Sequence, residues 1–278
     1  MLRGGAGGDD LDGGAGLDTA SYYNGSVGVV VDLATGKGSG GEAQGDFLYS
    51  IENLSGSQGN DNLYGNAGAN VLQGWNGNDV LRGAAGADRL DGGAGIDTAS
   101  YYTGTTGVVA SLASGLGSGG EAQGDTLAGI ENLSGSQGGD SLYGNGGANV
   151  LQGWNGNDAL IGRAGKDTLT GGAGADRFTF AALGDSVTGA NADRITDFSH
   201  AQGDRIDLAA IDARFTVAGD QAFSFIGTAA FTGVAGQLHT WHDAGRTIVS
   251  GDVNGNGTAD FNIVLTGTVN LVTGDFVL

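Results

Sequence analysis

The stretch Gly92-Gly93-Ala94-Gly95-Ile96-Asp97-Thr98-Ala99-Ser100 holds the pattern that decides the fold, and it recurs as Gly171-Gly172-Ala173-Gly174-Ala175-Asp176-Arg177-Phe178-Thr179. The chain contains twelve such nine-residue units, each with Gly at positions one and four and Asp or Asn at position six. Glycine supports positive φ and close backbone approach, so the first six residues predict a turn. The last three predict a short strand with one inward side chain. A fixed period of this kind indicates a solenoid of stacked units.

Position eight of each unit carries the apolar side chain that is expected to point into the solenoid. Burying one Leu contributes roughly 1.5–3 kcal/mol, whereas ordering the backbone costs on the order of 1–2 kcal/mol for every residue of the unit. Hydrophobic burial alone is therefore too small, and we expect another interaction to stabilise the turns. The position-eight residues are Leu11, Ala20, Leu63, Leu72, Leu81, Leu90, Ala99, Leu142, Leu151, Leu160, Leu169 and Phe178.

Position six supplies the carboxylates from which this further interaction is expected. Two units make one coil of eighteen residues, so Asp79 is predicted to stack over Asp97, and Asp158 over Asp176. Stacked carboxylates repel each other unless a cation lies between them. Two carboxylates with turn carbonyls form an oxygen-only shell, which suits Ca²⁺ better than Zn²⁺ or the geometrically more demanding Mg²⁺. The repeats contain no Cys or His that would favour a softer metal.

The predicted calcium ligands are therefore the position-six residues, together with glycine and asparagine residues of the turns. Where one partner is Asn, the pair has one carboxylate fewer and is expected to bind more weakly, as for Asn70 with Asp88 and Asn149 with Asp167. We expect several ions. The candidate ligands are Asp9, Asp18, Asp61, Asn70, Asp79, Asp88, Asp97, Asp140, Asn149, Asp158, Asp167, Asp176, Gly74, Asn76, Gly93, Gly95, Gly153, Asn155, Gly172 and Gly174.

A second, longer repeat of 79 residues shows that a large segment is duplicated, because Asp18-Thr19-Ala20-Ser21-Tyr22-Tyr23 recurs from Asp97 to Tyr102. Two related insert segments without the Asp spacing separate the nonapeptides. We expect each insert to form longer β-strands joined by a flexible loop, to continue the stack and to bind less metal. The nonapeptide runs are 4–21, 56–100 and 135–179, and the insert segments are 22–55 and 101–134.

After residue 179 the glycine content falls, and Phe, Ile and Val alternate with polar residues, as in Phe261-Asn262-Ile263-Val264-Leu265. This alternation predicts antiparallel strands, and a short helix is expected near 209–213. The predicted fold is all-β: a right-handed parallel β-roll over residues 1–179, followed by an antiparallel β-sandwich-like cap over residues 180–278.

The composition excludes several classes of protein. Gly accounts for 59 of 278 residues but Pro is absent, which excludes collagen. A net charge of −20 argues against nucleic acid or an anionic membrane as a partner. No apolar stretch approaches the ~20 residues of a membrane helix, and Met1-Leu2-Arg3-Gly4-Gly5 has no apolar core of a Sec-type signal peptide. Because the first repeat begins at Gly4, the chain is expected to be the tail of a longer polypeptide, and a short reading frame is the alternative.

The nonapeptides resemble the RTX (repeats-in-toxin) family of secreted bacterial proteins. The C-terminal part resembles a narrower group, the C-terminal domain of serralysin-type metalloproteases, and the two resemblances together cover nearly the whole chain. The stretches that carry the second resemblance are Gly174–Phe180, Asp193–Phe198, Asp204–Leu208, Gly219–Gly227, Gly251–Phe261 and Asp275–Leu278.

The resemblance implies that the roll binds Ca²⁺ through the position-six side chains and turn carbonyls. It also implies that the extreme C-terminus, Asp275-Phe276-Val277-Leu278, is recognised by the ABC exporter of a type I secretion system. Ca²⁺ is scarce in the cytosol and plentiful outside the cell, so binding free energy becomes folding free energy after export. We therefore expect a secreted, extracellular bacterial protein that folds when it binds Ca²⁺.

No catalytic site is predicted, because the chain lacks the zinc motif H-E-x-x-H and the nucleophile motif G-x-S-x-G. His239 and His242 are expected to be surface residues rather than metal ligands. Two alternatives remain open. The chain is the C-terminal part of a secreted enzyme with an upstream catalytic domain (a serralysin-type zinc protease, a lipase or an alginate epimerase), or it is a calcium-dependent adhesin or surface protein.

Three further features have alternative interpretations. The segment Asp252–Asp260 resembles the start of an EF-hand loop but lacks the final Glu, so a β-hairpin turn is expected there. Asp193 and Asp197 follow the last repeat and are candidates to close the final calcium site. Trp75 and Trp154 occupy equivalent turn positions, where exposure is expected and stacking on a sugar is the alternative.

Overall fold

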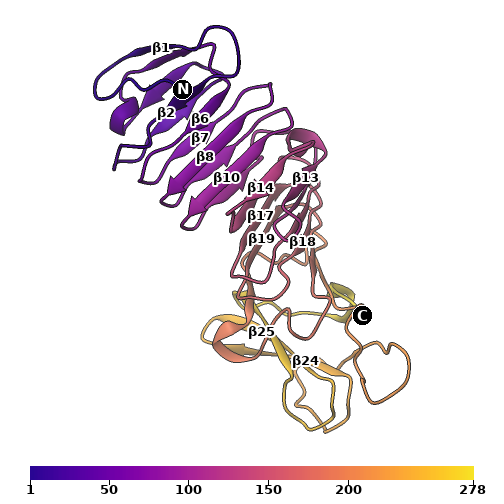
Figure 1. The fold of residues 1–278 in the computed structure, drawn as a ribbon. Coiled ribbons are helices and arrows are strands. Elements are labelled where there is room, and N and C mark those ends of the chain that lie inside the picture. The colour runs from indigo at the N-terminus through magenta and orange to yellow at the C-terminus, as the bar shows by residue number, and fades with distance from the viewer. The chain divides into compact units, whose positions relative to one another are not determined.

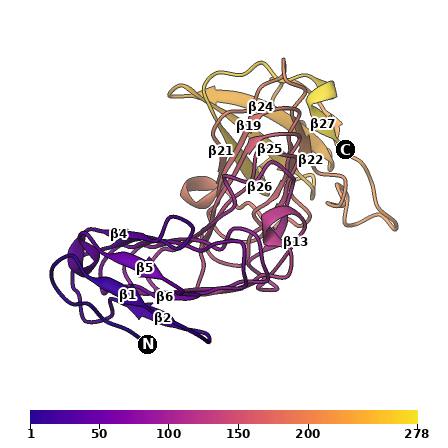
Figure 2. The same ribbon diagram turned by 90° about the horizontal axis from the view of Figure 1, so that it is seen from above.

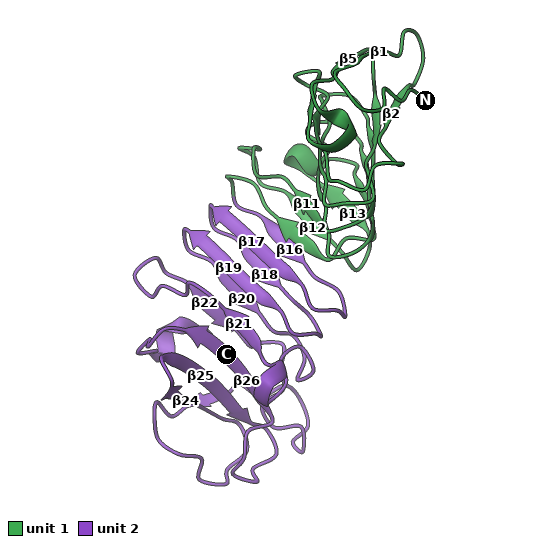
Figure 3. Cartoon of the chain, turned by 90° about the vertical axis from the view of Figure 1, so that its left-hand side faces the viewer, with its two compact units in different colours: residues 1–138 green, residues 139–278 purple.

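The computed structural model describes residues 1–278 and consists of β-strands, turns and four short 3-10 helices. The chain forms two compact units, residues 1–138 and residues 139–278 (Figure 3). The all-β prediction is confirmed, but the helix expected near 209–213 is wrong, since these residues form turns and bends. No helical segment is long and apolar enough to span a membrane. The 3-10 helices are η1 (Gly41–Ala43), η2 (Gly120–Ala122), η3 (Gly189–Asn191) and η4 (Thr273–Asp275).

Unit 1 contains two sheets of short strands (Figure 1). Within the nonapeptide runs the strands pair in parallel, and Leu63 lies opposite Leu81 in one sheet while Leu72 lies opposite Leu90 in the other. This register confirms the eighteen-residue coil. One sheet has the order β1 (Asp10–Asp12), β5 (Phe47–Tyr49), β4 (Lys37–Ser39), β3 (Val30–Asp32), β7 (Asn62–Tyr64), β9 (Val80–Arg82), β11 (Thr98–Ser100), β15 (Asn132–Ser134). The other has the order β2 (Thr19–Ser21), β6 (Asn53–Ser55), β8 (Val71–Asn76), β10 (Arg89–Ala94), β14 (Thr126–Ala128), β13 (Leu116–Ser118), β12 (Val109–Ser111).

The insert segments add antiparallel strands to the sheets, and these strands are short rather than long as expected. In segment 22–55, β3 pairs antiparallel with β4, and β4 with β5. The Gly/Ser-rich stretch holds β4 and η1, where a loop was predicted. Because β3 also lies parallel to β7, and β5 parallel to β1, the stack continues through the insert (Figure 2). In segment 101–134, β12, β13 and β14 pair in the same antiparallel way.

Unit 2 also contains two sheets, and their parallel pairing passes residue 179, because β19 pairs with β21 and β20 with β22. The cap is antiparallel from β24 to β26, and β26 joins β21 in parallel, so the cap extends the sheets of the roll. The domain boundary near residue 180 stays a prediction. One sheet has the order β17 (Val150–Asn155), β19 (Thr168–Ala173), β21 (Asp193–Ile195), β26 (Phe261–Thr266), β25 (Arg246–Asp252), β24 (Gln237–Asp243), β23 (Ser224–Phe225). The other has β16 (Ser141–Tyr143), β18 (Ala159–Ile161), β20 (Arg177–Thr179), β22 (Arg205–Asp207), β27 (Phe276–Val277).

The core of the roll is the row of apolar side chains predicted at position eight. All twelve are buried, with exposed fractions between 0 and 5 %. The parallel register stacks each of these side chains on its counterpart one coil away, which gives a continuous but narrow core. Tyr22 and Tyr101 are larger buried side chains at the start of the inserts. In the cap, Phe223 packs against Phe261 with ring centroids 5.7 Å apart.

Candidate metal centre

The position-six side chains lie where each turn meets its strand, and ten of the twelve are buried in the stack, whereas Asp9 and Asp18 in the first coils are partly exposed. Asp79, Asp97, Asp158 and Asp176 are each at most 2 % exposed. The pairing of β9 with β11 places Asp79 next to Asp97, and that of β18 with β20 places Asp158 next to Asp176. The carboxylates of neighbouring coils therefore stack in the pairs expected from the repeat.

One oxygen of each stacked carboxylate accepts a hydrogen bond from the backbone of the preceding coil. The N–H of Asp79 donates to Oδ1 of Asp97 at 2.7 Å, and the N–H of Asp61 donates to Oδ1 of Asp79 at 2.8 Å. In unit 2 the N–H of Asp158 donates to Oδ1 of Asp176 at 2.9 Å. These backbone dipoles offset part of the repulsion between carboxylates, so a cation is not the only group that separates them. We call the row of carboxylates that accept this bond the aspartate ladder.

The second oxygen of most ladder carboxylates has no hydrogen-bond partner. A buried polar atom without a partner destabilises a fold, and a charged one does so most strongly. A cation is the group that relieves this penalty without needing a further N–H donor. The nine buried Oδ2 atoms without a partner belong to Asp9, Asp79, Asp88, Asp97, Asp125, Asp158, Asp167, Asp176 and Asp193.

The turn glycines leave space beside these oxygens that a side chain would fill. A Cβ on Gly74 would lie 2.1 Å from Oδ2 of Asp79 and 2.6 Å from the carbonyl oxygen of Gly92. A Cβ on Gly95 would lie 1.7 Å from the carbonyl oxygen of Gly77. The space is lined by a carboxylate oxygen and by backbone carbonyl oxygens, which are the donors that Ca²⁺ takes in its adaptable shells. The residues present therefore fit a calcium ion.

The duplicated run in unit 2 repeats this arrangement. A Cβ on Gly153 would lie 2.1 Å from Oδ2 of Asp158. On Gly172 and Gly174 it would lie 1.9 and 1.6 Å from carbonyl oxygens of the preceding coil, and the equivalent distance for Gly93 in unit 1 is 2.1 Å. In both runs, the absence of side chains at these glycines thus leaves space beside the carboxylate and carbonyl oxygens.

Several predicted ligands have side chains that are already engaged. Both carboxylate oxygens of Asp61 accept backbone N–H groups. The side-chain amide of Asn70 accepts one backbone N–H and donates to a backbone carbonyl. The amide nitrogen of Asn76 donates to the side chain of Gln58 at the surface, which leaves the side-chain and backbone oxygens of Asn76 for a metal. Asp18 lies in the first coils and is half-buried.

In unit 2, the first two position-six residues also donate to the ladder. The backbone N–H of Asp140 donates to Oδ1 of Asp158, and that of Asn149 to Oδ1 of Asp167, both at 2.8 Å. Asp140 and Asn149 are buried, whereas Asn155 is exposed. The ladder thus begins within the first units of this run.

Burial raises the pKa of several ladder carboxyls, because the charged form loses its hydration. Desolvation raises the pKa of Asp79 and of Asp158 from 3.8 to about 7; the hydrogen bond from the backbone opposes this shift and the neighbouring ladder carboxylates add to it. Desolvation and the nearby charges of Asp167 and Asp185 raise the pKa of Asp193 to about 8. A divalent cation supplies the positive charge that lowers these pKa values again.

The ladder includes carboxylates that the nonapeptide pattern did not identify. Oδ1 of Asp46 accepts the N–H of Asp9 at 2.9 Å, and Oδ1 of Asp125 accepts the N–H of Asp88 at 2.8 Å. The expectation that the insert segments lack the Asp spacing is therefore wrong. Both residues lie two positions before a buried Leu, which is the spacing of positions six and eight, and this signal was available in the sequence.

Four more carboxylates extend the ladder, each accepting the N–H of a position-six residue one coil earlier at 2.8–3.0 Å. Asp193, a candidate to close the final site, is one of them. Asp197 has a different role, since its two oxygens accept the N–H groups of Gly171 and Gly172 and cap the last turn. The four carboxylates are Glu52, Glu131, Asp193 and Asp204.

No group of three or more His, Cys, Asp or Glu side chains converges anywhere in the chain, so a calcium ion in the ladder would depend on backbone carbonyl oxygens as well as on carboxylates. In the loop after β25, Asp252 and Asp260 accept backbone N–H groups of the loop itself, which is the hairpin turn expected between β25 and β26. His239 contacts the carbonyl oxygen of Ala229, and His242 contacts Oγ1 of Thr247.

Comparison with known proteins gives two family matches. The model of the peptidase M10 serralysin C-terminal domain matches residues 126–278, more than half of the chain. The model of the RTX calcium-binding nonapeptide repeat matches residues 1–20, 50–81 and 67–99. Both resemblances inferred from the sequence are confirmed. A search of curated proteins finds no match.

Two solved structures are similar to this chain. The AlgE6R3 subunit of the Azotobacter vinelandii mannuronan C5-epimerase has 32% identity and a TM-score of 0.38, and the match covers 53% of this chain and 77% of that one. The extracellular lipase LipA of Serratia marcescens has 18% identity and a TM-score of 0.27, and the match covers 81% of this chain but only 39% of the lipase.

Proposed function

The chain belongs to the family of the peptidase M10 serralysin C-terminal domain and carries RTX calcium-binding repeats, and we propose that it is a secreted module that folds when it binds Ca²⁺ outside the cell. Its position-six carboxylates and turn carbonyls would hold the ions, which neutralise the ladder and cross-link successive coils. The proposed ligand residues are those of the sequence analysis, with Asp125 and Asp193 added because their Oδ2 atoms are also buried and unpartnered.

The single observation that carries this proposal is the set of nine buried carboxylate oxygens without a partner. A fold that buries so many unpaired acceptors, in a chain of net charge −20, is strongly disfavoured without counterions. The core cannot compensate, because each nonapeptide buries only one apolar side chain. Calcium binding therefore becomes the main source of folding free energy.

The C-terminus supports a link between export and the unfolded state. In the folded chain, Phe276 pairs with β22 and is 6 % exposed, while Asp275 is 2 % exposed and accepts the N–H of Val272. Residues in this state offer little surface to a receptor. We infer that a type I exporter recognises the last residues before the chain folds, as low cytosolic Ca²⁺ would allow.

The chain has no catalytic role in this proposal. The alternatives are that it is the C-terminal part of a secreted enzyme or a calcium-dependent adhesin or surface protein. The repeats and the serralysin-type cap supply folding after export.

Circular dichroism of the full chain, recorded in EDTA and during Ca²⁺ titration, tests the proposal. We expect a disordered spectrum in EDTA, a cooperative gain of β-structure with Ca²⁺, and no such gain with Mg²⁺ at equal concentration. A chain with the same β-content in EDTA as in saturating Ca²⁺ would disprove calcium-dependent folding. Export is tested separately, by comparing secretion of the full chain with that of a chain lacking the last four residues in a host with a type I exporter.

A further inference from the structure

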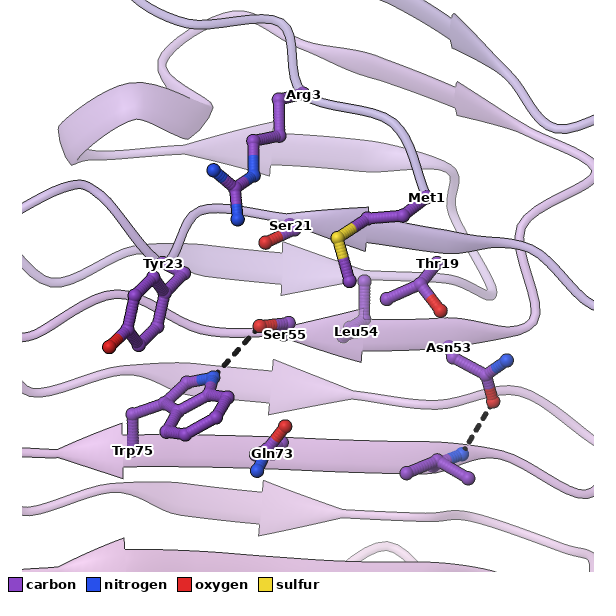
Figure 4. A pocket seen from close by; sticks show the side chains of 11 residues that line it. Met1, Arg3, Thr19, Ser21, Tyr23, Asn53, Leu54, Ser55, Gln73 and Trp75 are labelled. Carbon is purple, nitrogen blue, oxygen red and sulfur yellow. Dashed lines mark hydrogen bonds between the residues drawn. The ribbon is translucent and has the colours of Figure 1, made fainter.

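A hollow of about 460 Å³ lies on the outer face of the second sheet of unit 1, over β2, β6 and β8 (Figure 4). The calcium ladder does not use it. Trp75 and Tyr23 stand side by side at one end, and Ser21, Gln73 and Arg3 line the space beside them. Its size and its mixture of aromatic and polar groups are those of ligand-binding sites.

Trp75 is held in a fixed orientation by contacts that leave it on the surface of the hollow. Its ring meets the ring of Tyr23 edge-on, with centroids 4.7 Å apart and an interplanar angle of 64°. Its indole N–H donates to Oγ of Ser55 at 2.9 Å. The backbone φ of Trp75 is +79°, a conformation that aromatic residues rarely adopt, and Gly93 takes the equivalent position in the unit stacked on it. The same conformation occurs at position two of other units, at Ala84 and Arg163, so it belongs to the turn of the repeat and fixes where the Trp75 side chain leaves the backbone.

Three polar groups of the hollow, on Ser21, Gln73 and Arg3, have no hydrogen-bond partner within the protein. Ser21 is 2 % exposed, and its hydroxyl is buried without a hydrogen-bond partner. The side-chain amide of Gln73 and the guanidinium of Arg3 make no hydrogen bond or ion pair in the structure. A buried hydroxyl without a partner is unfavourable by itself, so it points to a ligand that completes it.

The hollow continues along the sheet. A second hollow of about 300 Å³ shares Asn53 and Val71 with the first and reaches Arg89 on β10, where the ladder residue Asp88 also lines it. The carboxamide of Asn53 is oriented by the N–H of Val71, which donates to its Oδ1 at 2.8 Å. Two adjoining hollows across parallel strands form an elongated groove, which suits a ligand made of repeated units.

We propose that this groove binds an oligosaccharide. One pyranose ring lies against Trp75, because the apolar C–H face of a sugar stacks on an aromatic ring whose polar edge is fixed. The sugar hydroxyls, which both donate and accept, satisfy the hydroxyl of Ser21 and the amide of Gln73. The net charge of −20 argues against a long polyanion such as nucleic acid as the ligand. Arg3 would add a charged hydrogen bond if the sugar carries a carboxylate.

The inference is independent of the proposed function, and its test uses the full chain in saturating Ca²⁺. A glycan array of neutral and uronic-acid oligosaccharides identifies the tightest ligand, which is then titrated calorimetrically. The array shows whether the chain prefers neutral or uronic-acid oligosaccharides. Arg3→Ala should weaken the binding of uronic-acid ligands only. Trp154 is the sequence counterpart of Trp75 at an offset of 79 residues, so the titrations use a Trp154→Ala background.

In this background we expect Trp75→Ala to lower the affinity about tenfold or more, a loss of about 1.4 kcal/mol. The matched control is Trp241→Ala, because Trp241 is also exposed and also donates its indole N–H to a serine hydroxyl, Oγ of Ser250. It should leave the affinity unchanged. Ser21→Ala should weaken binding without lowering the urea midpoint of the free chain, since it removes an unsatisfied group.

Three results would overturn the inference. The first is that no oligosaccharide on the array binds. The second is that Trp75→Ala leaves the affinity for the oligosaccharide unchanged. The third is that a peptide binds in the groove and no oligosaccharide displaces it. If sugar binding fails while circular dichroism still shows calcium-dependent folding, the proposed function stands and only the groove assignment is lost.

Discussion

The substitution Asp79→Asn separates the two roles of a ladder carboxylate. An Asn side chain can still accept the N–H of Asp61 at Oδ1, which the native carboxylate does at 2.8 Å. It replaces the buried, unpartnered Oδ2 with an amide group that cannot bind a cation. The hydrogen bond to the preceding coil is kept, and the calcium ligand is lost. The effect on stability should therefore have opposite signs with and without Ca²⁺.

The magnitudes follow from binding linkage and from the raised pKa. At a free Ca²⁺ concentration one hundred times the dissociation constant, each bound ion stabilises the fold by about 2.7 kcal/mol, so losing one ion lowers the unfolding free energy by that amount. Without Ca²⁺, burial raises the pKa of Asp79 to about 7 from 3.8. At pH 8 the charged group then destabilises the metal-free fold by at most roughly 4 kcal/mol, which Asn removes.

The assay is urea denaturation in saturating Ca²⁺, followed by circular dichroism, and folding induced by trimethylamine N-oxide in EDTA at pH 8. Asp79→Asn should lower the urea midpoint with Ca²⁺ and fold at lower osmolyte concentration without it. The control Asp10→Asn makes the same change of charge at an exposed residue of β1 and should alter neither value by much. Equal destabilisation with and without Ca²⁺ would refute the reasoning, because the carboxylate would then act only through its hydrogen bond.

Three further predictions concern the turns, the core and pH. Gly95→Ala places a Cβ 1.7 Å from the carbonyl oxygen of Gly77 at a residue with φ of +147°, so it should weaken calcium-dependent folding by at least about 1–3 kcal/mol. The control Gly146→Ala has open space around the new Cβ and should leave calcium-dependent folding unchanged. Similar calcium midpoints for the two variants would contradict this prediction. Leu81→Ala removes a fully buried side chain and should lower the unfolding free energy in Ca²⁺ by about 2–5 kcal/mol. The control Val71→Ala changes an exposed side chain and should have little effect. If Leu81→Ala has the same urea midpoint as the native chain, the core does not depend on this single row of side chains. In EDTA the pKa values of Asp79, Asp167 and Asp193 are about 7, 6 and 8 when folded and near 3.8 when unfolded, so the metal-free fold should be most stable below pH 4 and lose stability as pH rises to 8. In Ca²⁺ the dependence should reverse, because ions need deprotonated ligands, and a metal-free chain that gains structure on alkalinisation would show the burial argument to be wrong.

The roll and its calcium chemistry could be predicted because they are local. A period of nine fixes where turns and strands fall, and Leu81 or Leu90 at position eight can only point inward if the last three residues are a strand. Asp at position six, beside glycines without Cβ atoms, places oxygen donors in each turn whatever the rest of the chain does. These features need only a few neighbouring residues, so the sequence determined the solenoid, its eighteen-residue coil and the metal it suits.

The sequence predicted that the insert segments continue the stack, but the tertiary structure alone decided which coil each insert carboxylate meets. Asp46, Asp125 and Asp204 become ladder members because their strands pair with coils 28 to 37 residues earlier. Such pairing depends on the free energy of the whole sheet and not on the local pattern. The hydrogen bond that each ladder carboxylate accepts, and the groove around Trp75, likewise require backbone from other coils. A repeat encodes its own turn, whereas the contacts between coils exist only after the chain has folded.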